Sequence, residues 1–383
     1  MKRELTLTLT NDGECVSAID VRLPRFNATA LLGQRQASEA AGLLPSLFSI
    51  CAQAQAAAAV GAISAAHGQP LSSELIATHT IAVQIESVQE SLRSLCLGLP
   101  ETLLGQSSSQ GAALIADFSQ AWRNSTAFLA RLQKKLHHEA GSAEASDTAS
   151  EFAALIQEAK SIAQTWDHFC ARYVYGASVL SWQGEQNNAA SGEALPVMRW
   201  FQRMVEETPV LGKAALSPLP LAMFRSGALS WRALVEEPYD ASVWWRVQQD
   251  SRMVPIEARF GNSMAARLWA RLVDVARTLS DLLNAATGEI KPWVRVYALG
   301  DGSGMAEVEC ARGVLVHRVQ LVGQNIATYD VCAPTDWNLH REGSLATLMG
   351  VPSSDLARLQ THATWLVQVL DPCVAFNVEV VHA

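Results

Sequence analysis

Apolar residues recur at helical spacing through most of the chain. The pattern predicts long helices over 72–97, 112–138, 264–283 and 354–370. Between 40 and 66 the chain carries no charge, and the later half of this segment is mostly alanine. Alanine gains little from lipid, and the polar groups of the segment would be unpaired in a bilayer. We therefore expect a tightly packed, buried helix here and no membrane span.

The helix predicted over 264–283 has a two-sided pattern. Its leucines and valine fall on one face, and its charged residues lie mainly on the other faces: Arg267, Arg271, Asp274, Arg277 and Asp281. This distribution is typical of a plain amphipathic helix.

Strand-like alternation is confined to regions near the two chain ends. Residues 5–9 and 16–21 flank Asn11-Asp12-Gly13, which tolerates a positive φ, so a hairpin is predicted there. An antiparallel meander is predicted from the runs 294–297, 306–309 and 314–322. The expected fold class is α+β and mainly helical, with a central bundle of long helices and small antiparallel β elements near both ends. Two polar runs, 139–147 and 183–194, are interpreted as exposed loops.

Composition restricts the possible partners. Of the 383 residues, 49% are apolar and 17% charged, which excludes a disordered chain. The net charge is −8 without a basic stripe, so we expect no nucleic-acid or anionic-membrane partner. Seven cysteines are too few for a disulfide scaffold. The N-terminus lacks the apolar core of a signal peptide, and we therefore expect a cytoplasmic protein.

Two possible catalytic features are rejected. The glycine run at 300–304 is followed by a strand, whereas a phosphate-binding loop leads into a helix, so a hairpin turn is the better interpretation. Cys310 and His317 are seven residues apart, and alternation along one strand would place them on opposite faces. We therefore expect no nucleophile–base pair between them.

Two other thiols are better candidates for chemistry. Cys51 lies at the start of the alanine-rich helix, and Cys373 follows Asp371 and Pro372, which suit the N-cap and first position of a helix. Both thiols are thus expected in a first helical turn, where the positive dipole end favours a metal-binding thiolate. The free amides there would also suit anionic co-ligands. The alternative is two unrelated buried thiols.

The residues around these thiols resemble two motifs of the nickel–iron hydrogenase large subunit. The family's N-terminal motif, Arg-Ile-Cys-Gly-x-Cys-x-x-x-His, corresponds to 46–55 here, and its C-terminal motif, Asp-Pro-Cys-x-x-Cys-x-x-His, corresponds to 371–379. Between them, 309–317 resembles the family's Glu-Ala-Pro-Arg-Gly-x-Leu-x-His, and 333–338 resembles its Pro-Thr-x-Trp-Asn.

The chain departs from the family at ligand positions. Phe48 and Phe376 replace one Cys in each motif, Gln55 and Glu379 replace the two motif His, and Asn27 replaces the Glu expected to relay protons. Nickel would lose half of its soft ligands, so we expect no nickel. Active subunits of the family generally carry a C-terminal extension that is removed after metal insertion, and because only four residues follow the second motif here, we expect little to remove.

The retained residues resemble those of HupK/HoxV-type hydrogenase maturation proteins, large-subunit relatives that keep about one Cys per motif. The resemblance implies a scaffold, not an enzyme, that assembles or carries the iron–dicyanide–carbonyl unit for delivery to a hydrogenase large subunit. It also implies maturation chaperones and that subunit as partners. Cys51 and Cys373 would bind iron, while Arg312 and Asp371 match the residues beside the metal and its cyanide ligands.

The resemblance further implies a single large-subunit-like body over 1–383. Its parts would be an N-terminal region with the first Cys motif (1–100), a divergent helical middle (101–290) and a C-terminal region with the meander, last helix and second Cys motif (291–383).

Several alternatives remain open. The protein could be a pseudo-subunit that binds maturation proteins without metal, a reduced catalytic large subunit, or an unrelated cysteine hydrolase. Arg312 could instead form an ion pair with Glu309 or Asp371. Cys310 is interpreted as a packed thiol or a third ligand, and His317 as a packing or supporting residue. Trp337 and Asn338 are interpreted as a structural turn.

Overall fold

The computed structural model describes residues 4–24, 27–48, 50–98, 109–139, 149–184, 195–286 and 289–383. The two expected loops, 139–147 and 183–194, lie almost wholly outside the described residues. The chain divides into two compact units, each built from separate stretches of sequence. The first unit comprises Met1–Phe26, Trp200–Asp274 and Cys332–Ala383, and the second comprises Asn27–Arg199 and Val275–Val331.

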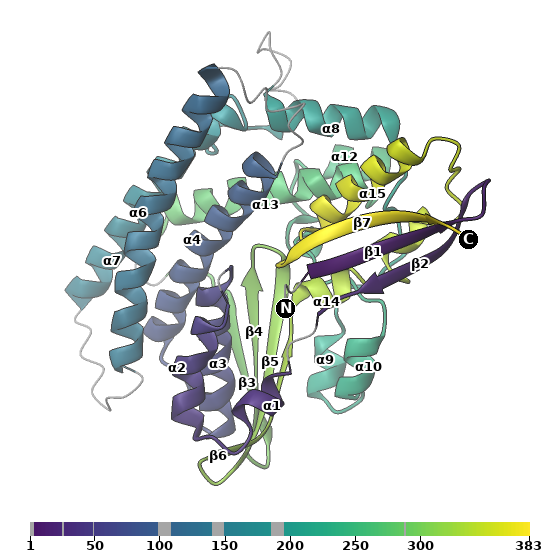
Figure 1. Cartoon of the computed structure of the whole chain (residues 1–383). Coiled ribbons are helices and arrows are strands. Elements are labelled where there is room, and N and C mark those ends of the chain that lie inside the picture. The colour runs from purple at the N-terminus through teal and green to yellow at the C-terminus, as the bar shows by residue number, and fades with distance from the viewer. Residues whose placement is uncertain are drawn as a thin grey trace. The chain divides into compact units, whose positions relative to one another are not determined.

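A three-stranded sheet in the first unit joins the two ends of the chain. The hairpin predicted around Asn11 is confirmed as β1 (Glu4–Asn11) and β2 (Val16–Arg22), which pair antiparallel. Strand β7 (Ala375–His382) runs parallel to β1 on its other side, so the order is β2-β1-β7 (Figure 1). The alternating leucines of β1 are fully buried. Sequence alternation did not indicate β7.

A four-stranded antiparallel sheet in the second unit confirms the predicted meander. Its strands, in spatial order, are β3 (Val294–Gly300), β4 (Ser303–Cys310), β5 (Gly313–Val322) and β6 (Asn325–Cys332). The glycine run at 300–304 forms the β3–β4 turn, with Asp301 and Gly302 at positive φ, which confirms the hairpin interpretation.

The alanine-rich helix packs directly on this sheet. The uncharged segment 40–66 is not one helix: it contains the end of α2 (Ala37–Ser46) and all of α3 (Ala52–Ala66). A Cβ atom added to Gly304 on β4 would lie 2.1 Å from the carbonyl oxygen of Ala62, so only glycine fits there. The small side chains of α3 thus let helix and sheet backbones approach, which confirms the expected tight packing.

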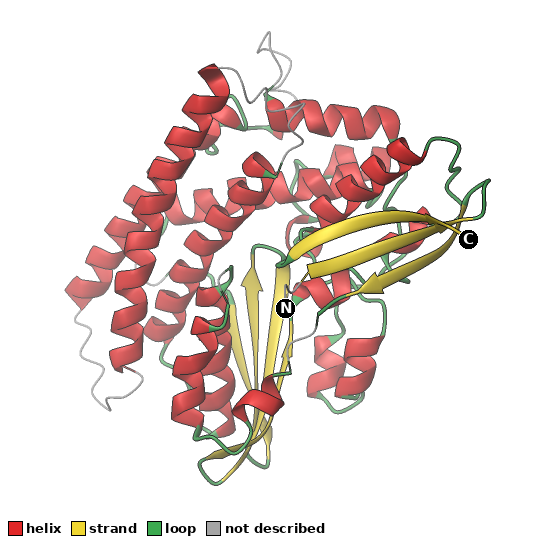
Figure 2. Cartoon of the chain, viewed as in Figure 1, coloured by secondary structure: helices red, strands yellow, loops and turns green. Residues whose placement is uncertain are grey.

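Long helices make up most of the rest of the second unit (Figure 2). They are α4 (Ser73–Leu97), α6 (Ser109–Glu139) and α7 (Ala149–Tyr173), with the short α1 (Ala28–Leu32) before them. The Ser72 hydroxyl accepts a hydrogen bond from Leu75 N and caps α4, as its sequence predicted. No helix within the described ranges is both long enough and apolar enough to cross a bilayer.

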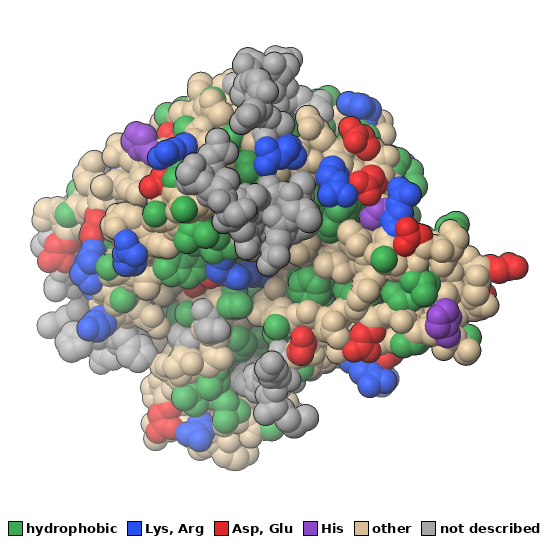
Figure 3. Space-filling model, turned by 45° about the horizontal axis from the view of Figure 1, so that its top comes forward, with side chains coloured by type: hydrophobic (Ala, Val, Ile, Leu, Met, Phe, Trp, Pro, Cys, Tyr) green, Lys and Arg blue, Asp and Glu red, His purple; other side chains and the backbone are tan. Residues whose placement is uncertain are grey.

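The remaining helices follow α7 in sequence. They are α8 (Pro196–Glu207), α9 (Leu221–Arg225), α10 (Trp231–Glu236), α11 (Trp244–Val247), α12 (Val254–Phe260), α13 (Met264–Leu283), α14 (Pro334–Asn338), the 3-10 turn η2 (Ser344–Leu348) and α15 (Leu356–Leu370). Acidic and basic side chains are interspersed on the face in Figure 3.

Helix α13 has the predicted bounds but is not plainly amphipathic. Arg267, Arg271 and Asp274, assigned to its other faces, are buried in the first unit with exposed fractions of 4%, 5% and 2%. Each meets a buried or nearly buried partner of opposite charge: Arg267–Asp240 at 2.7 Å, Arg271–Asp371 at 3.0 Å and Asp274–Arg246 at 2.7 Å. The plain amphipathic interpretation is therefore wrong, because distant segments supply countercharges that periodicity cannot reveal.

We expect Asp240→Ala to lower the free energy of unfolding by about 3–5 kcal/mol, because it leaves the Arg267 guanidinium buried without its countercharge. The matched control is Glu236→Ala, which breaks the exposed Arg232–Glu236 pair on α10. It should cost at most about 0.5 kcal/mol. Urea unfolding of both variants measures the difference, and equal losses would contradict the buried-pair account.

Candidate functional site

Cys51 occupies the position that its sequence predicted. The chain leaves α2 at Ser46 and enters α3 at Ala52, and Cys51 is the N-cap residue of α3. Its side chain is half-buried, and its carbonyl oxygen accepts the first intrahelical hydrogen bond, from Gln55 N at 2.9 Å. The thiol is therefore held at the positive end of a fifteen-residue helix.

The amides at this helix end are not free for an anionic co-ligand, so that expectation is wrong. Glu86, a buried residue of α4, accepts hydrogen bonds from Gln53 N at 2.8 Å and Ala54 N at 3.0 Å, one with each carboxylate oxygen. Burial raises the pKa of Glu86 to about 8, and the nearby Glu90 also raises it. The two amide hydrogen bonds and the charge of Arg312 lower the pKa but do not offset the effect of burial. A side chain of the protein thus fills the anion-binding position.

Arg312 lies in the β4–β5 turn and is buried. Its Nη2 atom lies 3.6 Å from the carboxylate of Glu90, which is one turn of α4 beyond Glu86. The acidic residues considered as alternative partners have other arginines: Arg295 binds Glu309 at 3.0 Å and Arg271 binds Asp371 at 3.0 Å. In the second unit, α4 therefore contacts both the helix end beside Cys51 and the guanidinium of Arg312.

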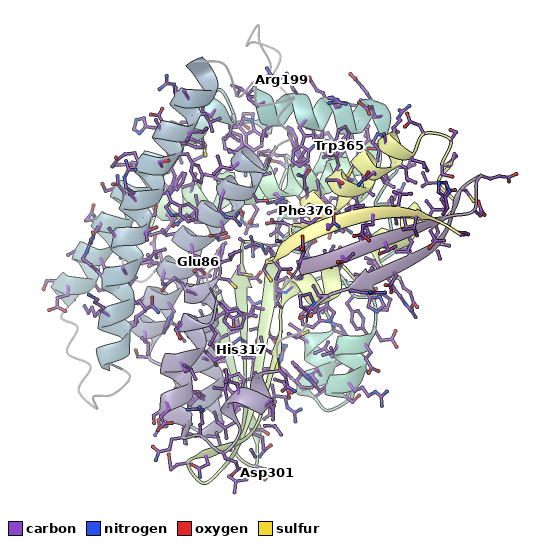
Figure 4. The ribbon with its side chains drawn as sticks, in the orientation of Figure 1. Glu86, Arg199, Asp301, His317, Trp365 and Phe376 are labelled. Carbon is purple, nitrogen blue, oxygen red and sulfur yellow. The ribbon has the colours of Figure 1, made fainter. Side chains whose placement is uncertain are left out.

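A hydrogen-bonded chain leads from Cys51 into the sheet. Gln55 Nε2 donates to Cys51 Sγ at 3.8 Å, and Gln55 Oε1 lies 2.8 Å from His317 Nε2. His317 Nδ1 lies 2.9 Å from the Tyr329 hydroxyl on β6. His317 is fully buried on β5 (Figure 4), and burial lowers its pKa to about 3. The sequence identified His317 as a packing or supporting residue but did not predict its hydrogen bonds to Gln55 and Tyr329.

Cys310 and His317 share a face of the sheet, so the expectation of opposite faces is wrong. They lie on different strands: Cys310 pairs with Gly313, and Ala306 pairs with His317. Facing residues of antiparallel strands point to the same side of the sheet. The β4–β5 turn lies between Cys310 and His317, so the rule of alternation along a single strand does not apply to them. The offset of four residues is about 13 Å along the strand. Separation, not orientation, therefore prevents a nucleophile–base pair.

Cys373 does not lie in a first helical turn, so that expectation is also wrong. Asp371 is the C-cap of α15, with a left-handed conformation (φ 52°, ψ 68°), and it ends the helix. Two residues after Cys373 the chain enters β7 and pairs with β1. Cys373 is half-buried, and its N–H donates to Thr335 Oγ1 of α14 at 3.2 Å. Its thiol therefore lacks the helix dipole that Asp371-Pro372 suggested.

Arg271 fixes the turn that carries Cys373, and sequence reasoning missed it. Its guanidinium donates to Gln368 O at 3.1 Å and to Asp371 Oδ2 at 3.0 Å. A cation at a helix C-terminus stabilises the last carbonyls. One buried arginine of α13 thus holds the end of α15 and the carboxylate that precedes Pro372.

The candidate residues fall into two groups, one in each unit. Cys51 and Arg312 lie in the second unit, and Asp371 and Cys373 lie in the first. Within the described ranges, no group of three or more His, Cys, Asp and Glu side chains is placed to hold a metal ion. The meeting of the two sulfurs stays a prediction of the sequence.

Trp337 and Asn338 have structural roles, but they lie in the short helix α14 and not in a turn. The Trp337 indole N–H donates to Leu234 O at 2.8 Å, and Asn338 Oδ1 accepts from Ala241 N at 3.0 Å. Both residues are buried and tie α14 to the chain around α10.

The pKa of Glu86 leads to a prediction for the pH dependence of stability. Its rise from 4.5 to about 8 means that the folded chain binds more protons than the unfolded chain between these values. The free energy of unfolding contributed by Glu86 is therefore fully present below about pH 4.5 and lost as the pH rises through 8. Glu86→Gln should reduce that slope by up to about 1.4 kcal/mol per pH unit. Urea unfolding at several pH values measures the slope.

The matched control for this experiment is Glu39→Gln, at an exposed position on α2. We expect this variant to keep the wild-type slope. The account of Glu86 fails if the two substitutions leave the pH dependence alike.

The chain was compared with known proteins. No family model matches the chain. It is 28% identical to the hydrogenase expression/formation protein HupK of Bradyrhizobium diazoefficiens, over 99% of this chain and 97% of that protein. It is 29% identical to HupV of Azotobacter chroococcum mcd 1, over 96% of each.

Solved structures show the same fold at much lower identity. The nickel–iron–selenium hydrogenase of Desulfovibrio vulgaris Hildenborough superposes with a TM-score of 0.54 and 13% identity, covering 96% of this chain and 95% of that chain. The structural neighbours are large subunits, and they share the α+β class. The chain is thus similar over nearly its whole length to hydrogenase expression/formation proteins named HupK and HupV, and it has the fold of a nickel–iron hydrogenase large subunit.

Proposed function

We propose that the protein is an accessory scaffold that assembles or carries the iron–dicyanide–carbonyl unit during maturation of a nickel–iron hydrogenase, and that it catalyses no reaction of its own. Its homologues are hydrogenase expression/formation proteins, which supports a role in hydrogenase maturation. The iron unit is the cargo in this proposal, and it is passed on to a hydrogenase large subunit.

The observation that carries the proposal is one anchored thiol in each unit. Cys51 is fixed by the α3 N-terminus, and Cys373 by the turn that Arg271 holds. Phe48 and Phe376 occupy the positions of the second pair of thiols in the motifs that this sequence resembles. Iron that already carries cyanide and carbonyl needs few further ligands, whereas nickel would find half of its soft ligands missing. Two thiolates therefore suit an iron cargo and not nickel.

Charged neighbours complete the proposed iron site. The planar guanidinium of Arg312 has five N–H donors, a number that allows it to bind Glu90 and a cyanide nitrogen together. Asp371 supplies a carboxylate two residues before Cys373 and, through Arg271, holds that turn in place. We assign both residues to binding of the cargo.

The small number of thiolates also gives transfer a direction. A carrier must bind its cargo less firmly than the destination does. This chain has two thiolates for the iron unit, whereas the metal site of the large subunit has four and also contains nickel. Transfer to the large subunit is therefore downhill in free energy. We propose that this exchange takes place in the cytoplasm, with maturation chaperones and the large subunit as partners.

A pseudo-subunit that binds maturation proteins without metal is the second candidate. Two observations favour it: Glu86 occupies the amides beside Cys51, and Cys373 is away from the positive end of a helix. Both features weaken the stabilisation of a thiolate. The two candidate functions differ in whether hydrogenase maturation requires the thiols of Cys51 and Cys373.

We expect cyanide and carbonyl infrared bands on the chain isolated from cells that contain the maturation machinery. Cys51→Ala and Cys373→Ala should each remove the bands, because each deletes one of two protein ligands. Cys15→Ala is the matched control, since Cys15 is also half-buried but lies at the β1–β2 hairpin outside both motifs. It should retain the bands.

The pseudo-subunit is correct instead if the Cys51→Ala/Cys373→Ala double variant supports hydrogenase maturation as well as the wild type does. Hydrogen uptake by the purified chain alone would contradict both candidates and indicate a catalytic large subunit.

A further inference from the structure

We propose that His317 and Tyr329 act through Gln55 to aim an amide N–H at the sulfur of Cys51, which makes these three side chains positioning residues for that thiol. They belong to three elements of the second unit: Gln55 to α3, His317 to β5 and Tyr329 to β6. The proposal concerns the protein's own hydrogen bonds and holds whether or not a metal is present.

The contact at the sulfur comes from helical spacing. Gln55 follows Cys51 by four residues, so its side chain lies over the first turn of α3. Its Nε2 is 3.8 Å from Cys51 Sγ, within hydrogen-bonding range of a sulfur acceptor. Gln55 is 1% exposed, so water does not compete for its amide. The direction of this amide therefore depends on what binds its other end.

His317 holds that other end. Gln55 Oε1, 2.8 Å from His317 Nε2, can only accept, so the imidazole must carry its proton on Nε2. Nδ1 is then an acceptor and accepts a hydrogen bond from the Tyr329 hydroxyl at 2.9 Å. Burial also lowers the pKa of His317 to about 3, which keeps the ring neutral. One tautomer of His317 thus specifies one orientation of Gln55.

The opposite tautomer of His317 would reverse the direction of the hydrogen bond between Gln55 and Cys51. With the proton on Nδ1, Nε2 would accept from the Gln55 NH2 group, and Gln55 Oε1 would turn to Cys51. The thiol would then donate to a carbonyl oxygen, which stabilises S–H, whereas an N–H donor stabilises the thiolate. The buried histidine therefore determines whether this sulfur accepts or donates a hydrogen bond.

One consequence rests on the proposed function. A hydrogen bond to a ligating sulfur draws electron density from it and tunes the metal it binds. An amide donor at Cys51 would weaken the iron–sulfur bond, which suits a protein that must release its cargo. The residues that tune this release lie at positions where the resembled motifs have histidine: Gln55 replaces one, and His317 is retained.

The test uses the metal-free full chain, so it does not depend on the proposed function. Nitrogen-15 shifts of the histidine rings, assigned with His317→Gln, report the tautomer directly. We expect a neutral His317 with its proton on Nε2. Gln55→Leu removes the acceptor and should let both tautomers be populated. Tyr297→Phe, at a tyrosine of β3 outside the chain of hydrogen bonds, should leave the signal unchanged.

A second measurement reads the sulfur itself. The S–H stretching band of Cys51 at about pH 5, assigned by its loss in Cys51→Ala, should stay near its wild-type frequency in Gln55→Leu, because in the proposed orientation the S–H does not donate to Gln55. A proton on Nδ1 of wild-type His317, a doubly protonated ring, or a clear rise of the S–H frequency in Gln55→Leu, which would mean that the thiol donates to Gln55 Oε1, would each overturn the proposal. Failure here would leave the infrared test of iron binding intact.

Discussion

The carboxyl group of Glu86, which accepts hydrogen bonds from the Gln53 and Ala54 amides in the first turn of α3, makes the interaction on which the candidate site depends most. It joins α4 to the helix end that carries Cys51, and Glu90, one turn further along α4, contacts Arg312. A buried carboxyl group is costly unless its oxygens are hydrogen-bonded, and here each oxygen accepts from a backbone N–H. The thiol and the guanidinium are therefore positioned by one helix.

In the first unit, a buried arginine has the corresponding role. Arg271 reaches from α13 to the last carbonyls of α15 and to Asp371, and so fixes the turn before Cys373. Each thiol is thus half-buried on a short connection that one buried side chain holds, Glu86 for Cys51 and Arg271 for Cys373. Rigid support with few ligands is the combination that a carrier requires, because it preorganises binding without making it irreversible.

Sequence patterns predicted the local structure well and the long-range contacts poorly. Hydrophobic spacing identified α4, α13 and α15, and turn residues identified both hairpins. Periodicity treats every charge as facing water, so it missed the burial of Arg267, Arg271 and Asp274. Asp-Pro is a good helix start, yet pairing with β1 made the residues after Cys373 a strand. Cys51 was placed correctly because a helix N-terminus is local, whereas Glu86, Glu90 and Gln55 have partners that only the fold brings near.

The central claim is that two sulfurs of this chain bind one iron atom. X-ray absorption at the iron edge, on the chain isolated with its cargo, counts the sulfur neighbours directly. The account predicts two sulfurs per iron, together with short iron–carbon distances from the cyanide and carbonyl ligands. Iron with no sulfur neighbour, or with four, would contradict it.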